Sequence, residues 1–299
     1  MSFRCGFACF VGRPNAGKST LTNALVGTKV AITSDKPQTT RHAVRGIVHR
    51  ADGQLVVVDT PGLHRPRTLL GERLNDVVRE TLTEVDVVGM CVPADERVGP
   101  GDRFIARELA DLRRTPKVAI VTKTDRVDRQ EVAARLLEVA ELADFTEVVP
   151  VSAVTGEQVE LLAGLLVGLL PEGPPLYPDG ELTDEPDQVL VAELVREAAL
   201  EGVREELPHS IAVVVEEMGL RADRDEDRPL LDVSAVLFVE RDSQKAIVIG
   251  RGGERLRAVG TSARHQIEAL LGVPTYLDLR VKVAKDWQRD PRQLRRLGF

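Results

Sequence analysis

Along residues 1–170, short continuous apolar runs alternate with stretches in which apolar residues recur every three or four positions. The runs that predict strands are residues 7–11, 54–59, 85–92, 117–122 and 147–151. Between these runs, apolar residues at every third or fourth position predict amphipathic helices, for example over residues 18–26 and 132–140. Apolar strands that alternate with helices are typical of a parallel sheet covered on both faces. We therefore predict an α/β domain that binds ligands beyond the carboxyl ends of its strands.

A change of composition separates a second pattern from the first. Residues 171–187, PEGPPLYPDGELTDEPD, hold five prolines and six acidic residues, which predicts an extended polar linker. The pattern beyond it is helix 188–202, strands 210–217 and 231–241, a glycine turn, helix 254–271, strand 275–284 and a basic C-terminal helix. We therefore predict one domain at residues 1–170, a linker at 171–187 and an α+β domain at 188–299.

The composition of the 299-residue chain excludes several classes of protein. No apolar run reaches the ~18 residues of a membrane span, and the N-terminus lacks the features of a signal peptide, which predicts a cytoplasmic protein. Cys5, Cys9 and Cys91 are too few for a disulfide framework and are expected to be buried. The net charge is −7, yet residues 241–299 carry 13 basic and six acidic side chains, which predicts a surface there that faces a polyanion.

Residues 12–19 match the phosphate-binding pattern GxxxxGK[ST] between a predicted strand and a predicted helix. Glycines in this context let backbone N–H groups surround a phosphate, and the helix N-terminus adds its dipole. Lys18 is expected to bridge the β- and γ-phosphates, and the Ser19 hydroxyl is expected to ligate Mg²⁺. The predicted nucleotide-binding residues of this loop are Gly12, Arg13, Pro14, Asn15, Ala16, Gly17, Lys18, Ser19 and Thr20.

An acidic residue ends the apolar run 54–59 and opens a second motif. An acid at the end of a buried strand beside a phosphate loop can hold Mg²⁺ through water, and the Gly62 N–H can reach the γ-phosphate. Because this motif lies about 40 residues after the phosphate loop, a role in binding Mg²⁺ and phosphate is favoured over an ordinary turn. The predicted nucleotide-binding residues of this segment are Asp59, Thr60, Pro61, Gly62 and Leu63.

Two further motifs follow the runs 117–122 and 147–151 and predict recognition of a guanine base. The Asp125 carboxylate can accept from guanine N1–H and the 2-amino group together, whereas adenine offers neither donor. Lys123 would lay its stem over the base, and the loop containing Ser152 would touch the base from the other side. The predicted base-binding residues are Thr122, Lys123, Thr124, Asp125, Val151, Ser152 and Ala153.

The segments GRPNAGKST, KPQTTRH, DTPGLH, TKTD and VSA closely resemble the Era family of bacterial GTPases, and the resemblance covers nearly the whole chain. It implies a P-loop GTPase domain with a mostly parallel sheet and helices on both faces. It also implies that Thr40, with Thr39 as the neighbouring alternative, closes on Mg²⁺ and the γ-phosphate. The first switch would be residues 31–46 and the second residues 63–81. The implied Mg²⁺ ligands are Ser19, Thr40 and Asp59, and the implied catalytic residues are Lys18, Thr40, Asp59 and Gly62.

Two residues depart from the patterns of many GTPases. Thr122 stands where many have Asn, and a hydroxyl can tie loops together but cannot copy the paired donor and acceptor of an amide. Leu63 stands where Ras-like enzymes place the Gln that orients water. A leucine cannot orient water, so slow intrinsic hydrolysis is expected unless another group or a partner helps.

Gly250-Arg-Gly-Gly253 is a GxxG sequence before an amphipathic helix. Such a loop can bring its backbone against four nucleotides of single-stranded RNA, as in KH domains, although alone it is also typical of a glycine turn that caps a helix. Its basic surroundings, and the resemblance of IVIGRGGERLRAVG to the Era C-terminal domain, favour a KH domain of bacterial topology. Trp287 is expected to pack the last helix onto the domain, and that helix is either a second RNA contact or an exposed basic helix. The predicted RNA-binding residues are Gly250, Arg251, Gly252, Gly253, Arg255, Arg257, Arg289 and Arg292, with Arg295 and Arg296 beside them.

Together these features predict a Mg²⁺-dependent switch that binds GTP and GDP, hydrolyses GTP and is fused to an RNA-binding domain. The Era resemblance implies that the partners are small-subunit ribosomal RNA and the small ribosomal subunit during its maturation. It also allows peripheral attachment to the inner face of the cell membrane, and we expect a monomer. The alternatives are a tRNA-modifying or other RNA-associated P-loop NTPase, and a module in which the nucleotide is only structural.

Overall fold

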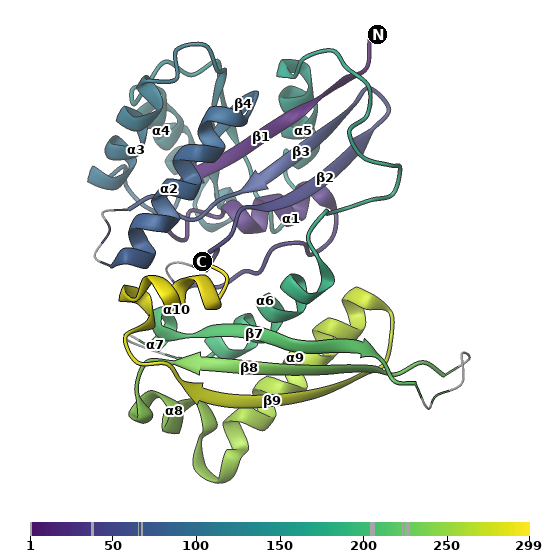
Figure 1. Cartoon of the computed structure of the whole chain (residues 1–299). Coiled ribbons are helices and arrows are strands. Elements are labelled where there is room, and N and C mark those ends of the chain that lie inside the picture. The colour runs from purple at the N-terminus through teal and green to yellow at the C-terminus, as the bar shows by residue number, and fades with distance from the viewer. Residues whose placement is uncertain are drawn as a thin grey trace. The chain divides into compact units, whose positions relative to one another are not determined.

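The computed structural model describes residues 2–36, 39–64, 66, 68–203, 207–222, 224 and 228–299. It contains two compact units: the first holds a six-stranded sheet and most of the residues up to Asp184, and the second holds a three-stranded sheet and Glu185–Phe299 (Figure 1). In the part of the chain so described, no helix is long and apolar enough to cross a membrane. Residues 37 and 38 of the predicted first switch, and 65 and 67 of the predicted second switch, lie outside the described residues.

The six-stranded sheet has the order β2-β3-β1-β4-β5-β6, and each neighbouring pair is parallel except β2 and β3. This confirms the predicted mostly parallel α/β architecture. The elements of this unit in chain order are β1 (Arg4–Gly12), α1 (Lys18–Val26), β2 (Val44–Arg50), β3 (Gly53–Asp59), α2 (Leu69–Glu84), β4 (Val87–Pro93), α3 (Pro100–Ala110), β5 (Lys117–Thr122), α4 (Arg129–Ala140), β6 (Glu147–Pro150) and α5 (Val159–Leu169).

Helices cover both faces of this sheet, because the alternate residues of its inner strands are apolar on both sides. Phe10 and Leu55 face α1 and α5, and they form one buried aliphatic cluster with them. Cys9, next to Phe10 on β1, and Val58, three residues after Leu55 on β3, face α2, α3 and α4 and belong to a second cluster. All three cysteines are buried and free, as expected. Burial raises the pKa of the Cys9 and Cys91 thiols to about 12, so both remain protonated at neutral pH.

Strand β2 was not predicted, because its sequence VRGIVHR mixes charged and apolar residues without clear alternation. It is an edge strand, antiparallel to β3, and it is buried on both faces near its middle, where the consecutive residues Ile47 and Val48 point to opposite sides. Its first residue, Val44, lies inside the region predicted as the first switch. That prediction therefore includes the start of a sheet strand.

The proline-rich segment after α5 is held against the six-stranded sheet. The side chain of Gln54, only 1% exposed, accepts from the backbone N–H groups of Leu176 and Tyr177 at 2.7 and 3.0 Å. Further along, Ile47 N–H donates to the Leu182 carbonyl at 2.9 Å. Residues 171–184 therefore group with the first unit in the structure.

The second unit has a sheet of order β7-β8-β9, in which β7 and β8 are antiparallel and β8 and β9 are parallel. Helices α6 and α9 pack against each other and against this sheet (Figure 1). The elements are α6 (Asp187–Leu200), α7 (Leu207–Ser210), β7 (Ala212–Leu220), β8 (Leu231–Val239), α8 (Asp242–Ile249), α9 (Glu254–Leu271), β9 (Thr275–Val283) and α10 (Pro291–Arg296), with single 3₁₀ turns at Arg251–Gly253 and Trp287–Arg289.

Helix α8 corrects the predicted order of this unit. The prediction ran a strand to Arg241 and followed it directly with an apolar run and the glycine turn, but the run at 246–249 is helical. The Gln244 side chain accepts from the Arg241 N–H at 3.0 Å and so starts the helix, and a four-residue apolar run does not by itself distinguish strand from helix. Trp287 is fully buried, stacks on Phe299 and donates to the Ser210 carbonyl, which confirms its predicted packing role.

Candidate functional site

The predicted nucleotide motifs lie at the carboxyl ends of four strands that share one sheet. The phosphate loop follows β1, the Asp59 motif ends β3, the Thr122 motif ends β5, and the Ser152 loop follows β6. Since the order is β3-β1-β4-β5-β6, these four ends meet at one edge of the sheet. The fold thus brings residues from 12 to 153 together, as expected for ligand binding on an open α/β sheet.

The phosphate loop has a backbone that its small residues make possible. Asn15 and Gly17 have φ angles of 63° and 88°, in the left-handed region that favours glycine and tolerates asparagine. A Cβ on Gly12 would lie 2.7 Å from the Cys91 carbonyl oxygen, so the loop packs directly on β4. A Cβ on Gly62 would lie 2.7 Å from Pro14 N, so the two predicted phosphate-binding motifs are in backbone contact.

Three oxygen-bearing side chains converge beside the N-terminus of α1. Ser19 Oγ donates to Asp59 Oδ2 at 2.6 Å, Thr40 Oγ1 donates to the same oxygen at 3.1 Å, and the two hydroxyls are 3.0 Å apart. Asp59 is fully buried, and its other oxygen, Oδ1, has no hydrogen-bond partner in the described part of the chain. These are the three residues that the resemblance implied as Mg²⁺ ligands.

Lys18 lies next to this cluster and is almost fully buried, at 6% exposure. Among the described residues, its Nζ makes only long contacts, 3.5 and 3.3 Å, to the carbonyl oxygens of Gly12 and Arg13. Burial lowers the pKa of Lys18 and raises the pKa of Asp59, and the opposite charge of each partner counters both changes. A buried ammonium with two weak acceptors is suited to bind an anion.

The base-recognition motifs are tied to each other and to the phosphate loop. Thr122 Oγ1 donates to the Ala16 carbonyl at 2.7 Å, so the hydroxyl makes the loop contact that was expected of it. Fully buried Ser152 donates to Asp125 Oδ1 at 2.6 Å, which fixes an otherwise exposed carboxylate. Lys123 has a φ of 58°, and its Nζ lies 3.6 Å from Asp95.

Sequence reasoning missed the acidic partners of Arg13. Arg13 Nε donates at 2.8 Å to Asp102, which is fully buried, and Nη1 pairs with Glu96 at 3.0 Å. The other oxygen of Asp102 accepts from the Gly99 N–H at 2.8 Å at the start of α3. Arg13 was predicted to contact the nucleotide, but at least two of its donors are directed to these carboxylates. An acid three residues after Gly99, following Pro100, was a visible helix-start signal.

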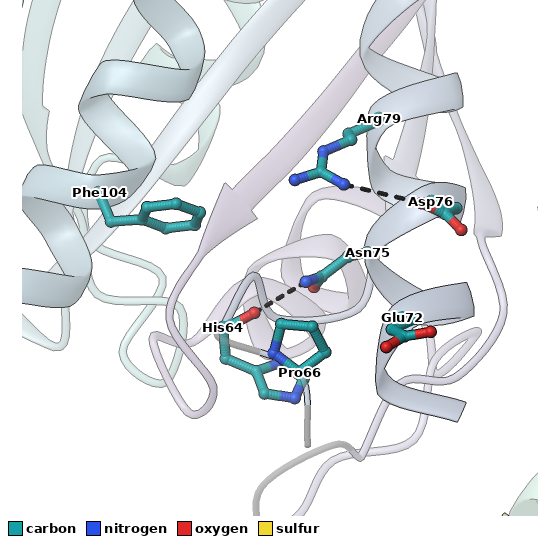
Figure 2. Close-up of a pocket in the computed structure, with 7 residues that line it drawn as sticks. All are labelled: His64, Pro66, Glu72, Asn75, Asp76, Arg79 and Phe104. Atoms are coloured by element: carbon teal, nitrogen blue, oxygen red, sulfur yellow. Dashed lines mark hydrogen bonds and ion pairs between the residues drawn. The ribbon is translucent and has the colours of Figure 1, made fainter. Parts of the chain in front are cut away.

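The segment after the Asp59 motif is held by the sheet and by α2. Thr60 Oγ1 donates to the Phe10 carbonyl at 2.7 Å, so its hydroxyl serves the sheet. The Leu63 side chain is 2% exposed and joins the cluster under α2 and α3. Asn75 donates to the His64 carbonyl at 2.8 Å beside a cavity of about 400 Å³, into which Arg79 and Phe104 also face (Figure 2). This contact fixes the chain direction two residues after Gly62.

The predicted RNA-binding residues lie on two parts of the second unit. Gly250, Gly252 and Gly253 all have positive φ angles and form the turn before α9. Arg251 is exposed, whereas Arg255 is half-buried against the end of α6. Arg289 lies in a 3₁₀ turn rather than in the last helix, and Arg292, Arg295 and Arg296 lie on α10, all four exposed.

The family profile described as "50S ribosome-binding GTPase" matches residues 7–123, and the profile described as "KH domain" matches residues 206–288. The chain is 70% identical to GTPase Era of Streptomyces coelicolor over 301 aligned residues, covering 99% of this chain and 95% of that protein. It is 67% identical to GTPase Era of Mycolicibacterium smegmatis, covering 99% of both chains. The chain belongs to the Era family of GTPases.

Two solved Era structures share the whole fold. One is Era in complex with MgGDPNP and nucleotides 1506–1542 of 16S ribosomal RNA, with a TM-score of 0.93, 36% identity and 99% of each chain covered. The other is an Aquifex aeolicus Era variant bound to GDP and AlF4⁻, with a TM-score of 0.93, 37% identity and the same coverage. These matches confirm the P-loop GTPase domain followed by a KH domain.

Proposed function

We propose that this chain is a GTP-hydrolysing switch that binds small-subunit ribosomal RNA and assists assembly of the small ribosomal subunit. The proposal rests mainly on one observation: four side chains lie together at the edge of the sheet that also carries the Asp125 motif. They are Lys18, Ser19, Thr40 and Asp59. A catalytic cation, a metal-ligand set and a guanine-selective carboxylate are the parts that GTP hydrolysis needs. The solved Era complex with 16S ribosomal RNA supports the RNA partner.

The nucleotide would be held at both of its ends. The N–H groups of the phosphate loop and the Lys18 ammonium would bind the β- and γ-phosphates, since the described residues offer Lys18 only weak acceptors. Asp125, oriented by Ser152, would accept hydrogen bonds from two donors of guanine. Adenine lacks both donors, so neither bond would form and the preference for guanine nucleotides would be strong.

The oxygen set formed by Ser19, Thr40 and Asp59 fits Mg²⁺. Two hydroxyls and a carboxylate are ligands that this hard cation prefers, and the buried Asp59 Oδ1, which has no hydrogen-bond partner among the described residues, supports this fit. When bound, Mg²⁺ would neutralise developing charge on the phosphate oxygens. We propose that Ser19 and Thr40 bind it directly and that Asp59 acts through water.

The leucine side chain at position 63 cannot position the attacking water. Leu63 is packed in the core cluster under α2 and α3, its side chain carries no polar atom, and its backbone N–H already donates to the Gly12 carbonyl at 3.2 Å. The Gly62 N–H would contact the γ-phosphate from the turn that packs on Pro14. We therefore propose a slow intrinsic hydrolysis that depends on phosphate positioning by Lys18, Thr40 and Gly62.

Phosphate release from GTP and from ATP, measured with and without Mg²⁺, tests the nucleotide part of this proposal. We expect slow turnover of GTP, none of ATP, and none of either with Lys18→Ala. Equal turnover of both nucleotides would favour another RNA-associated P-loop NTPase. Crosslinking of the GDPNP-bound protein to RNA in cell extract, followed by mapping, tests the RNA part, and crosslinks that avoid small-subunit RNA would overturn it.

A further inference from the structure

The glycine turn before α9 has a packed side and an open side. A Cβ on Gly250 would lie 2.7 Å from Arg255 Cβ and 3.1 Å from Arg255 N, so Gly250 faces the first turn of the helix. Cβ atoms on Gly252 and Gly253 would meet nothing within 4 Å. Because these two glycines have φ angles of 59° and 77°, L side chains would be strained there despite the space. The open side is where another backbone can approach closely.

Arg257 binds the turn itself. Its Nη2 donates to the Gly252 carbonyl at 2.8 Å, and its Nε donates to the Gly253 carbonyl at 3.3 Å. Carbonyl oxygens repel a phosphate, whereas backbone N–H groups attract it. By covering these two oxygens, the guanidinium makes the turn a better surface for an anionic backbone, and it fixes the two peptide planes.

Arg255 binds a different part of the unit. Its Nη2 donates to the Glu201 carbonyl at 2.8 Å, immediately after α6, with a longer contact of 3.5 Å to the Ala199 carbonyl. Carbonyls at a helix C-terminus lack partners within the helix, and an arginine there satisfies them. Arg255 therefore joins the start of α9 to the end of α6. Arg251, by contrast, is exposed, and its side chain makes no hydrogen bond or ion pair with the described residues.

We propose that Arg255 and Arg257 are positioning residues, with Arg257 holding the carbonyls of the glycine turn and Arg255 holding the start of the helix that follows it, and that of these three arginines only Arg251 contacts an RNA phosphate. This inference rests on the proposed RNA function. It divides a basic cluster that looks uniform in sequence into one contact residue, one residue that acts through the turn backbone, and one that joins the start of α9 to the end of α6.

The salt dependence of RNA affinity separates these roles. When a protein binds single-stranded nucleic acid, a plot of log affinity against log salt concentration has a negative slope, and each phosphate contact makes that slope steeper by about 0.7. The probe is a fluorescent RNA with nucleotides 1506–1542 of 16S ribosomal RNA, and its binding to the full chain with GDPNP is measured by anisotropy at several KCl concentrations. The slope should be about 0.7 shallower for Arg251→Ala than for the wild type. Arg257→Ala should weaken binding about tenfold, the scale of one charge-assisted hydrogen bond, with the slope unchanged. Arg255→Ala should also leave the slope unchanged.

Two further variants keep the test independent of folding. Arg257→Lys keeps the charge but cannot reproduce the two directed bonds, so we expect weaker binding with an unchanged slope, whereas a direct phosphate contact would survive this change. Arg264→Ala, two turns further along α9, is the matched control and should bind as the wild type does. In glycine-labelled NMR spectra without RNA, Arg257→Ala should shift the amide signal of Gly253, whose peptide group contains the Gly252 carbonyl. Arg251→Ala adjoins Gly252 in sequence and should shift the Gly253 signal little.

The outcomes distinguish this inference from the proposed function. A slope change for Arg257→Ala equal to that for Arg251→Ala, or full affinity of Arg257→Ala, would overturn the positioning roles while leaving RNA binding in place. Wild-type affinity of Gly253→Asp, with the second unit folded by circular dichroism, would instead overturn RNA binding at the turn.

Discussion

The Thr122 hydroxyl donates a 2.7 Å hydrogen bond to the backbone carbonyl of Ala16, and so joins the base-recognition motif to the phosphate loop across 106 positions of sequence. Thr122 is 4% exposed, and a Cβ on Gly17 would lie 3.4 Å from its hydroxyl oxygen. One hydroxyl therefore makes the link for which many GTPases use an asparagine, and it does so in a space bounded by glycine.

Thr122→Val should destabilise this link without changing the size of the side chain. The Ala16 carbonyl would lose a buried donor, which costs about 1–3 kcal/mol in the free energy of unfolding. We expect faster dissociation of a fluorescent GDP analogue, measured by stopped flow, and a lower midpoint in urea. Thr122→Ser keeps the hydroxyl and is the control. Equal dissociation rates for all three proteins would show that the bond does not support nucleotide binding.

Asp125→Asn should change the base preference. The amide can donate to the carbonyl that replaces the 2-amino group in xanthine, so titration calorimetry should show weaker GDP binding and stronger XDP binding. Ser152→Ala, which removes the 2.6 Å bond to the carboxylate, should weaken GDP binding without favouring XDP. Wild-type protein that binds ADP as tightly as GDP would contradict the assignment of Asp125.

Arg13→Ala should lower stability through Asp102. Among the described residues, the change leaves the fully buried Asp102 carboxylate with the Gly99 N–H as its one hydrogen-bond donor. Removal of one member of a buried ion pair costs about 3–5 kcal/mol in general. Because Arg13 is 24% exposed, we expect a smaller loss of about 2 kcal/mol by urea denaturation. Glu96→Gln breaks the exposed pair and should cost less than about 1 kcal/mol. A larger effect from Glu96→Gln than from Arg13→Ala would reverse this ranking.

Leu63→Ala should change GTP turnover little. The side chain packs in the core cluster and orients no water, so its loss should appear in stability, by about 2–5 kcal/mol for a buried leucine, rather than in the chemical step. Single-turnover phosphate release at saturating GTP measures this step. A loss of several hundredfold, with GTP affinity intact and the protein folded, would show that position 63 takes part in the chemistry.

The Tyr177 hydroxyl should lose its proton at a higher pH than an ordinary tyrosine. Burial, and the 2.7 Å bond that its hydroxyl donates to Asp184, raise the pKa of Tyr177 to about 12. The folded state therefore holds this proton more tightly than the unfolded chain, with its ordinary pKa of about 10. The resulting stabilisation is complete below about pH 10 and is lost as the pH rises through 12.

A phenolate absorbance titration in a Tyr276→Phe background isolates this group, since the chain has two tyrosines. We expect a midpoint near 12, and a midpoint closer to 10 when Asp184→Asn removes the acceptor. Near-ultraviolet circular dichroism of Trp287 would report that the protein stays folded. A midpoint of 10 in the folded protein would show that residues 171–184 do not shield Tyr177 in solution.

Features that depend on neighbours in sequence were predictable. The phosphate loop was found because its pattern requires glycine, lysine and serine at fixed short spacings between a strand and a helix. The parallel strands were found because strands buried on both faces are continuously apolar. The glycine turn before α9 was found in the same way, from four consecutive residues.

Features that depend on distant residues were decided by the tertiary structure. The sequence by itself determined that Arg13 lies in the phosphate loop, but only the packing of α3 beside that loop directs its guanidinium to Asp102, 89 residues away. It determined that Arg251, Arg255 and Arg257 are close together, but only the positions of α6 and the turn carbonyls separate their contacts. The physical reason is the same in each case: a local pattern specifies the conformation of a segment, whereas the partner of a long polar side chain depends on which other segment the folded core places within about 3 Å of it.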